Sequence, residues 1–132
     1  MTDPTPSAEP TGPSVTAEPA APAGRTFVST HVLDTGTGRP AVGVGVALED
    51  ADGSVLGSGR TDEDGRLAAV GPPRLQPGRY TLRFDSGAYF AGVGTTTFYP
   101  EVMVAFTVTD AESHLHVPLL LSPFGYSTYR GS

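Results

Sequence analysis

The sequence predicts an all-β fold, a β-sandwich of about eight short strands in two sheets with one short helix. Two observations favour this class. Short runs rich in Val, Thr, Leu and Phe recur along the chain, separated about every 8–12 residues by turns that contain Gly, Pro or Asp. Within these runs apolar residues fall at alternate positions, as in strands that bury one face. No heptad pattern, long helix or internal repeat competes with this interpretation.

The first 24 residues differ in composition from the rest of the chain. They hold six of the 13 prolines, three acidic residues and no basic residue. Met1 and Val15 are the only sizeable apolar side chains, so this segment cannot bury enough surface to offset the entropy of ordering. We therefore predict a disordered leader over 1–24 and a single domain over 25–132. Composition leaves open that the leader is a regulatory or partner-binding tail.

The first strands are predicted on either side of a loop. Thr26–Leu33 and Val42–Glu49 alternate as strands, and Asp34–Pro40 between them is rich in turn residues. Asp52-Gly53 is a hairpin turn that leads into a strand at Ser54–Arg60. One side of the first strand carries Phe27, Ser29, His31 and Leu33. The face of the second strand that we expect in the core carries Val42, Val44, Val46 and Leu48.

The middle of the domain continues the pattern. A turn at Thr61–Gly65 precedes a strand at Arg66–Val70, and a loop follows at Pro72–Gly78. The next strand, Arg79–Asp85, places its larger apolar residues at every second position. Ser86–Val93 is the one plausible helix, and it is short.

Three strands close the chain. The first is predicted at Pro100–Thr109, and the last at Phe124–Arg130, after the break at Ser122-Pro123. Between them lies a strand with two unlike faces. Its aliphatic face, which we expect to meet the core, carries Leu115, Val117, Leu119 and Leu121. Its other face carries His114, His116, Pro118 and Leu120, and so holds two of the three histidines.

Composition excludes several classes of function. The chain has no cysteine, so it has neither a disulfide framework nor a thiolate metal site. Its net charge is −6 and all eight basic residues are Arg, with no basic patch among aromatics, so we expect no nucleic-acid partner. No segment approaches the ~20 apolar residues of a membrane span, and no apolar run of signal-peptide length is present. We expect a soluble, cytoplasmic protein with no membrane partner.

Three motifs carry more specific information. They are His31-Val32-Leu33-Asp34 followed by Gly38-Arg39-Pro40-Ala41, Thr61-Asp62-Glu63-Asp64-Gly65-Arg66, and the C-terminal run from Leu119 to Ser132. In this order they resemble the motifs of the transthyretin-like 5-hydroxyisourate hydrolases. The terminal Tyr129-Arg130-Gly131-Ser132 is the mark that separates these hydrolases from the hormone-carrying transthyretins. The resemblance covers roughly Thr26 to Ser132.

This resemblance implies a transthyretin-like (prealbumin-like) sandwich and a hydrolytic enzyme. Its implied substrate is 5-hydroxyisourate, and the implied product is a hydroxy-carboxy-ureidoimidazoline between urate and allantoin. It also implies a homotetramer, a dimer of dimers, with active sites between subunits. We expect no cofactor. With no cysteine and only three histidines, we also expect no metal site.

His116 is the first candidate for the site. The strand pattern leaves open a plain surface histidine, but the resemblance implies an active-site histidine at the position two before Pro118, where carriers have a residue that cannot ionise. Leu115 departs from the Tyr commonly found there, which should alter packing more than chemistry. His114 shares the face of His116 and either supports it or lies at the rim, so it stays outside the predicted catalytic set.

His31 and Arg66 complete that set. The pattern leaves open a half-buried strand histidine that donates to a backbone carbonyl, and a solvated arginine. The resemblance implies instead a second active-site imidazole and a guanidinium whose fork suits a planar, anionic ureide. We predict His31 and His116 as acid–base pair and water-positioner, in an order left open, with Arg66 as oxyanion partner. Tyr129 and Ser132 are implied to hold the purine edge.

Two rival classes of protein and one rival motif remain. A transthyretin-like carrier would bind a ligand without chemistry, and would not need His116, Arg66 and the Tyr-Arg-Gly-Ser end together. An immunoglobulin-like interaction module fits the strands but leaves the motifs unexplained.

Asp62–Gly65 resembles the start of a calcium loop but lacks its remaining ligands, so we interpret it as a polar turn. No nucleophile elbow is present either, which leaves water as the nucleophile.

Overall fold

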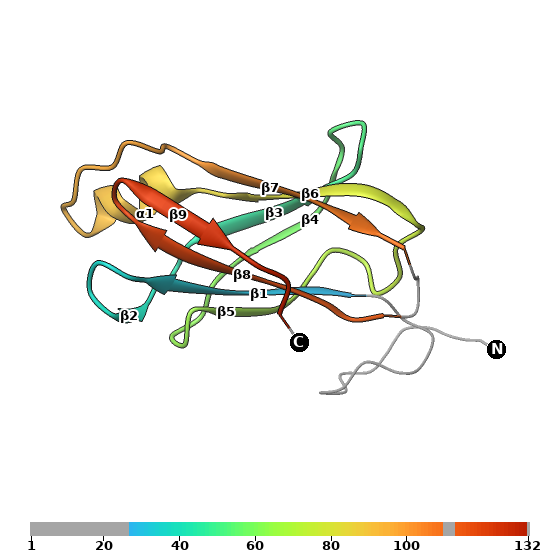
Figure 1. Cartoon of the computed structure of the whole chain (residues 1–132), viewed down its shortest axis with the longest axis horizontal. Helices are drawn as coiled ribbons and strands as arrows, with labels where there is room; N and C mark the ends of the chain where they lie inside the picture. Colours follow the sequence, from blue (N-terminus) through green and yellow to red (C-terminus); the bar gives the residue numbers. More distant parts are fainter. Residues whose placement is uncertain (1–26, 110–112, 132) are drawn as a thin grey trace.

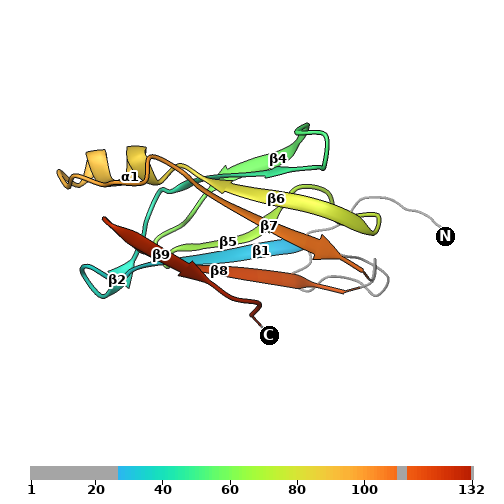
Figure 2. The same ribbon diagram turned by 45° about the horizontal axis from the view of Figure 1, so that its top comes forward.

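Two β-sheets packed face to face make up the protein in a computed structural model that describes residues 27–109 and 113–131 (Figure 1). Figure 2 shows the two layers, with the helix α1 at one end and the C-terminus on the outer side of one sheet. The predicted β-sandwich with one short helix is confirmed. The leader predicted over 1–24 lies outside the described residues, as does Ser132.

The first sheet contains β1 (Val28–Asp34), β2 (Arg39–Pro40), β5 (Arg66–Val70), β8 (Leu115–Ser122) and β9 (Gly125–Thr128). Its strand order is β2-β1-β8-β9, and β5 pairs with the half of β1 that β2 leaves free. The second sheet has the order β4-β3-β6-β7. Its strands pair antiparallel throughout, whereas the pairing of β1 with β8 in the first sheet is parallel.

The four strands of the second sheet are β3 (Gly45–Glu49), β4 (Val55–Arg60), β6 (Gly78–Phe84) and β7 (Val102–Val108). The chain therefore leaves the first sheet after β5 and returns at β8, next to the strand with which it began. This return places Ser29 opposite His116. The pairing joins residues that are 87 positions apart in the sequence.

Alternation builds the core between the sheets. In β8 the predicted aliphatic face is buried, and in β6 the same holds for every second residue. Nonpolar side chains from both sheets interdigitate there, and burying them is the main force that holds the layers together. The largest side chains with almost no exposed surface are Phe84, Phe90, Leu48, Leu82, Leu119 and Leu121.

The structure corrects the prediction for the second strand. Val44, Val46 and Leu48 are buried as expected, but Val42 is 51% exposed, and β3 begins only at Gly45. Gly43 has φ of 79°, a left-handed conformation that breaks the alternation of sides. Residues before this turn therefore do not share the face of those after it.

The predicted loop at Asp34–Pro40 is also more ordered than expected, because β2 folds back onto the end of β1. The remaining strands and the helix agree with prediction to within a few residues, and Arg66–Val70 matches at both ends.

Helix α1 (Ser86–Gly92) follows β6 and covers one end of the sandwich (Figure 1). The side chain of Asp85 caps it by accepting from the backbone N–H of Ala88. Phe90 enters the core, and the Tyr89 hydroxyl donates to Asp34 at 2.7 Å. Within the described residues, no helix has the length and apolar character needed to cross a membrane.

Candidate active site

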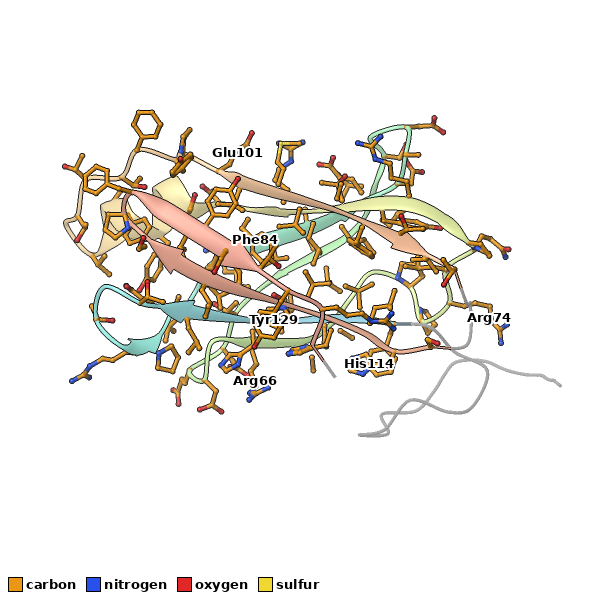
Figure 3. The ribbon with its side chains drawn as sticks, in the orientation of Figure 1. Arg66, Arg74, Phe84, Glu101, His114 and Tyr129 are labelled. Carbon is orange, nitrogen blue, oxygen red and sulfur yellow. The ribbon has the colours of Figure 1, made fainter. Side chains whose placement is uncertain are left out.

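Side chains from three neighbouring strands meet on the outer side of the first sheet. Ser29 is the register partner of His116, and His31 is the register partner of Arg66. Partners project to the same side of a sheet, and His114 shares that side two positions before His116. We call this set the histidine face: Ser29, His31, Arg66, His114 and His116. Figure 3 shows Arg66 and His114 on this side of the molecule.

His116 of β8 and His114, directly before that strand, share one hydroxyl group. Ser29 Oγ lies 2.8 Å from His116 Nδ1 and 2.8 Å from His114 Nε2. Ser29 is itself buried although it points outward, and the two rings are 6.3 Å apart. The prediction that His114 and His116 share a face is confirmed. His114 also stacks on Phe27, with ring centroids 4.1 Å apart.

Both rings have lowered pKa values. Burial lowers the pKa of His114 below its ordinary value. For His116, burial is again the largest cause, followed by the nearby charges of His114, Arg66 and His31, and a hydrogen bond to the Ser29 backbone opposes this lowering. Since a histidine is half protonated near pH 6.5 without such effects, both rings are mainly neutral at pH 7. A neutral imidazole can accept a proton.

His31 makes one defined hydrogen bond, in which its Nε2 lies 3.0 Å from the carbonyl oxygen of Asp64. A carbonyl has no proton to give, so Nε2 of His31 is the donor in this bond. The donation to a backbone carbonyl that the pattern left open for this histidine is therefore present. The same bond fixes the ring beside Arg66, its partner on β5.

A tight turn positions Arg66. The carboxylate of Asp62 accepts from the backbone N–H of Asp64 at 2.9 Å and of Arg66 at 3.0 Å, and these bonds lower the pKa of Asp62. Gly65 has φ of 75°, and a Cβ there would collide with the carbonyl oxygen of Val32. The predicted polar turn is thus docked against β1. Within the described residues, no carboxylate forms a salt bridge with the Arg66 guanidinium.

The C-terminal segment covers His116. The backbone N–H of Gly131 donates to the carbonyl of His116 at 2.8 Å, and a Cβ on Gly131 would overlap the imidazole ring. Only glycine allows the backbone to approach a ring so closely. Tyr129 is 59% exposed, and with Arg130 and His116 it lines a cavity of about 320 Å³ between β7 and β8. Ser132 lies beyond the described part of the chain.

A larger hollow, of about 490 Å³, lies on the opposite side of the molecule over the second sheet. Arg83, which lines this hollow, is already paired, because it forms salt bridges with Glu49 at 2.8 Å and with Glu101 at 2.9 Å. We therefore place the chemistry on the histidine face. In residues 27–109 and 113–131, no three His, Asp or Glu side chains group closely enough to hold a metal ion.

Sequence reasoning brought His31, Arg66 and His116 forward, and the structure gathers all three. It did not identify Ser29 and Gly131, which both contact His116. The alternation of the first strand places Ser29 on the same side as His31, and this was the one sequence signal that Ser29 lies near the site. The strand that would lie beside it could not be predicted from that pattern.

Comparison with known proteins shows the family of this chain. Residues 28–131 match the family model described as the HIUase/Transthyretin family. The 5-hydroxyisourate hydrolase of Salmonella dublin is 47% identical over 114 residues, which cover 83% of this chain and 84% of the relative. Among solved structures, the 5-hydroxyisourate hydrolase of Klebsiella pneumoniae is 39% identical, with a TM-score of 0.75, and the match covers 81% of this chain and 94% of that one.

A sea bream transthyretin solved in complex with thyroxine is also similar. It is 30% identical with a TM-score of 0.72, and the match covers 79% of this chain and 93% of that chain. Both branches of the family therefore share this sandwich. The chain belongs to the HIUase/Transthyretin family.

Proposed function

We propose that this protein is a 5-hydroxyisourate hydrolase, which opens the ring of its substrate by adding water and yields a hydroxy-carboxy-ureidoimidazoline. The observation that carries the proposal is the meeting of His31, Arg66 and His116 on one face, in a chain whose relatives include proteins named for this activity. Two imidazoles and a guanidinium supply a proton acceptor, a second proton-bearing group and a positive charge. Addition of water to an electron-poor carbonyl requires such groups.

In this mechanism His116 takes the proton from the attacking water. Its lowered pKa keeps the ring neutral at pH 7, and its Nδ1 is already occupied by Ser29, so Nε2 is the nitrogen available to water. As water adds to the ring carbonyl, its first proton passes to Nε2. When the adjoining C–N bond opens, the leaving nitrogen takes the second proton of that water, and a carboxylate remains on the carbon.

Arg66 and His31 act on the other side of the reacting carbonyl. The guanidinium can bind neighbouring ureide oxygens with two parallel N–H groups and stabilise the oxyanion as it forms. His31, held by Asp64, orients the substrate or the water. Tyr129 and Ser132 complete the site by holding the purine edge.

We also propose the homotetramer. Strand β7 ends the second sheet and β9 ends the first, so each presents an edge that a second copy can pair with. Aromatic side chains are exposed around β9, with Phe124 at 71% and Tyr126 at 43%. Light scattering coupled to size-exclusion chromatography tests this assembly.

A cytoplasmic location also remains a prediction, which fractionation of expressing cells would test.

The test of the function is to generate 5-hydroxyisourate in situ from urate and follow its ultraviolet absorbance. We expect the absorbance to decay faster with the protein present. His116→Asn should lower kcat/KM at least about a hundredfold, the scale of lost acid–base catalysis. Arg79→Lys, a conservative change at an exposed position of the second sheet, is the control. If the wild-type protein does not accelerate the decay, the carrier function represented by the sea bream relative becomes the better interpretation.

The pH profile of kcat/KM tests the assignment of the base. Because burial lowers the pKa of His116, its lone pair is lost only as the pH falls below about 6.5, so activity should decline on that side. A profile that stays level down to about pH 5 would contradict a histidine base.

A further inference from the structure

The hydroxyl group of Ser29 joins two imidazoles that the proposed mechanism uses unequally. His116 acts on water, whereas His114 has no assigned function, yet both ring nitrogens lie 2.8 Å from the same oxygen. A contact this short on both sides is a hydrogen bond on both sides. The three groups therefore form a continuous path from His116 to the rim of the histidine face, where His114 is exposed.

Counting protons gives this path a direction. A serine hydroxyl has one proton and two lone pairs, so it can donate to only one of the two rings and must accept from the other. If His116 is to accept a proton at Nε2, its neutral ring carries the existing proton on Nδ1, which then donates to Ser29. The Ser29 proton is left to donate to Nε2 of His114.

We propose that His116, Ser29 and His114 form a proton relay that carries the proton taken from water out to solvent. This relay rests on the proposed hydrolase function. When Nε2 of His116 gains the proton from water, its Nδ1 proton moves to Ser29 Oγ and the Ser29 proton moves to Nε2 of His114. His116, now with its proton on Nε2, and Ser29 are then neutral, and the single positive charge is on His114, from which solvent removes a proton. Exchange of the imidazole protons with solvent returns both rings to the Nδ1–H form before the next turnover.

The charges around the two rings favour this outward movement. His116 faces Arg66 on β5 and His31 on β1, and both oppose a positive charge on its ring, as does His114 itself. His114 shows no such influence from Arg66, since burial alone lowers its pKa. Among the described residues, it contacts the hydroxyl of Ser29 and the ring of Phe27, which stacks on it.

The relay is tested by removing its outer nitrogen. His114→Phe keeps an aromatic ring to stack on Phe27 but cannot accept a proton. We expect kcat to fall on the order of tenfold in dilute buffer, less than for a directly acting base, with KM unchanged. Added imidazole should restore kcat in a saturable manner, because a small base can take the proton in place of His114. Phe27→Leu removes the stacking and keeps the nitrogen, so it serves as the control and should retain kcat.

Two results would overturn the relay. One is a loss in His114→Phe that imidazole does not restore, which would mean a structural function. The other is full activity of this variant in dilute buffer. Wild-type turnover is measured in the same series. Its absence would contradict the hydrolase function, whereas wild-type turnover with an unaffected variant would contradict the relay alone.

A second measurement does not depend on turnover. Nitrogen-15 NMR of the imidazoles reports which ring nitrogen carries the proton. We expect His116 and His114 both in the Nδ1–H form in the neutral protein. Ser29→Ala should release His116 from this form, and Ser29→Thr, which keeps the hydroxyl, should preserve it. A wild-type His116 found in the Nε2–H form would reverse the direction of donation and overturn the relay.

Discussion

The side chains of the histidine face lie at outward positions of β1 and β5 and at the start of β8. His31 and Arg66 are partners across β1 and β5, and their positions depend on the Asp62 turn that leads into β5. Among the described residues, Arg66 has no carboxylate partner, so its guanidinium is available to an anionic ligand. The planar fork of N–H groups also requires that the ligand oxygens lie in a matching position. The proposed binding of a ureide depends on that geometry.

Arg66→Lys should therefore be nearly as damaging as Arg66→Ala. An ammonium keeps the charge but cannot place two parallel donors against neighbouring oxygens. We expect both variants to lower kcat/KM by at least about a hundredfold, the scale of one lost oxyanion donor. Arg79→Lys, at an exposed strand position of the second sheet, is the matched control and should be neutral. If Arg66→Lys keeps most of the activity, Arg66 supplies charge only.

At the scale of elements, one buried carboxylate connects the helix to the strand that carries His31. Asp34 is 3% exposed at the end of β1. One of its oxygens accepts from the backbone N–H of Gly36 at 3.0 Å, and the other accepts from the Tyr89 hydroxyl of α1 at 2.7 Å. Burial and this hydrogen bond raise the pKa of Tyr89 to about 12.

Tyr89→Phe should lower the free energy of unfolding at pH 7 by about 1–3 kcal/mol, because the buried carboxylate loses a donor. Urea denaturation measures this change. Tyr126→Phe, at a position 43% exposed, is the control and should change the free energy by less than about 0.5 kcal/mol.

The same pair of proteins gives a pH dependence. A tyrosine in an unfolded chain has a pKa of about 10, and the folded value is raised to about 12. The folded state thus holds this proton more tightly, so the stability that Tyr89 contributes is complete below pH 10 and is lost as pH rises through 12. The difference in stability between wild type and Tyr89→Phe should therefore narrow across this window. A constant difference would show that ionisation of Tyr89 is not linked to folding.

At the scale of the whole molecule, the C-terminus returns to the face on which the chemistry is proposed. Figure 2 shows the segment after β9 on the outer side of the first sheet, and Gly131 lies against the ring of His116. An ordinary terminus frays, and its last residues have little effect on function. Here they are part of the surroundings of a proposed catalytic ring.

A C-terminal affinity tag should consequently impair the protein more than an N-terminal one. We expect the C-terminally tagged protein to fold and assemble but to lose about tenfold or more in kcat/KM, the scale of a misplaced catalytic group. The N-terminally tagged protein should behave normally, since residues 1–24 have little apolar surface to pack. Circular dichroism and light scattering establish folding and assembly. Equal activity of the two proteins would remove Ser132 from the proposed site and weaken the case for Tyr129.

The sequence by itself determined which residues face inward on most strands, because alternation is a local property of the extended chain. Leu115 and Leu119 on one side of β8, and His114 and His116 on the other, could be assigned from the pattern alone. Where one residue leaves the extended conformation, as Gly43 does, the pattern misassigned Val42. The catalytic candidates came from the resemblance of the motifs to those of a known family, because alternation of side chains gives no information about chemistry.

Only the tertiary structure decided which strands are neighbours. The parallel pairing of β1 with β8 joins positions 87 residues apart, and nothing local to Ser29 predicts that it will lie between two imidazoles. The approach of Gly131 to His116 likewise depends on where β9 ends. Strand order and register follow from packing the whole core at once, so contacts between distant segments are decided by that packing.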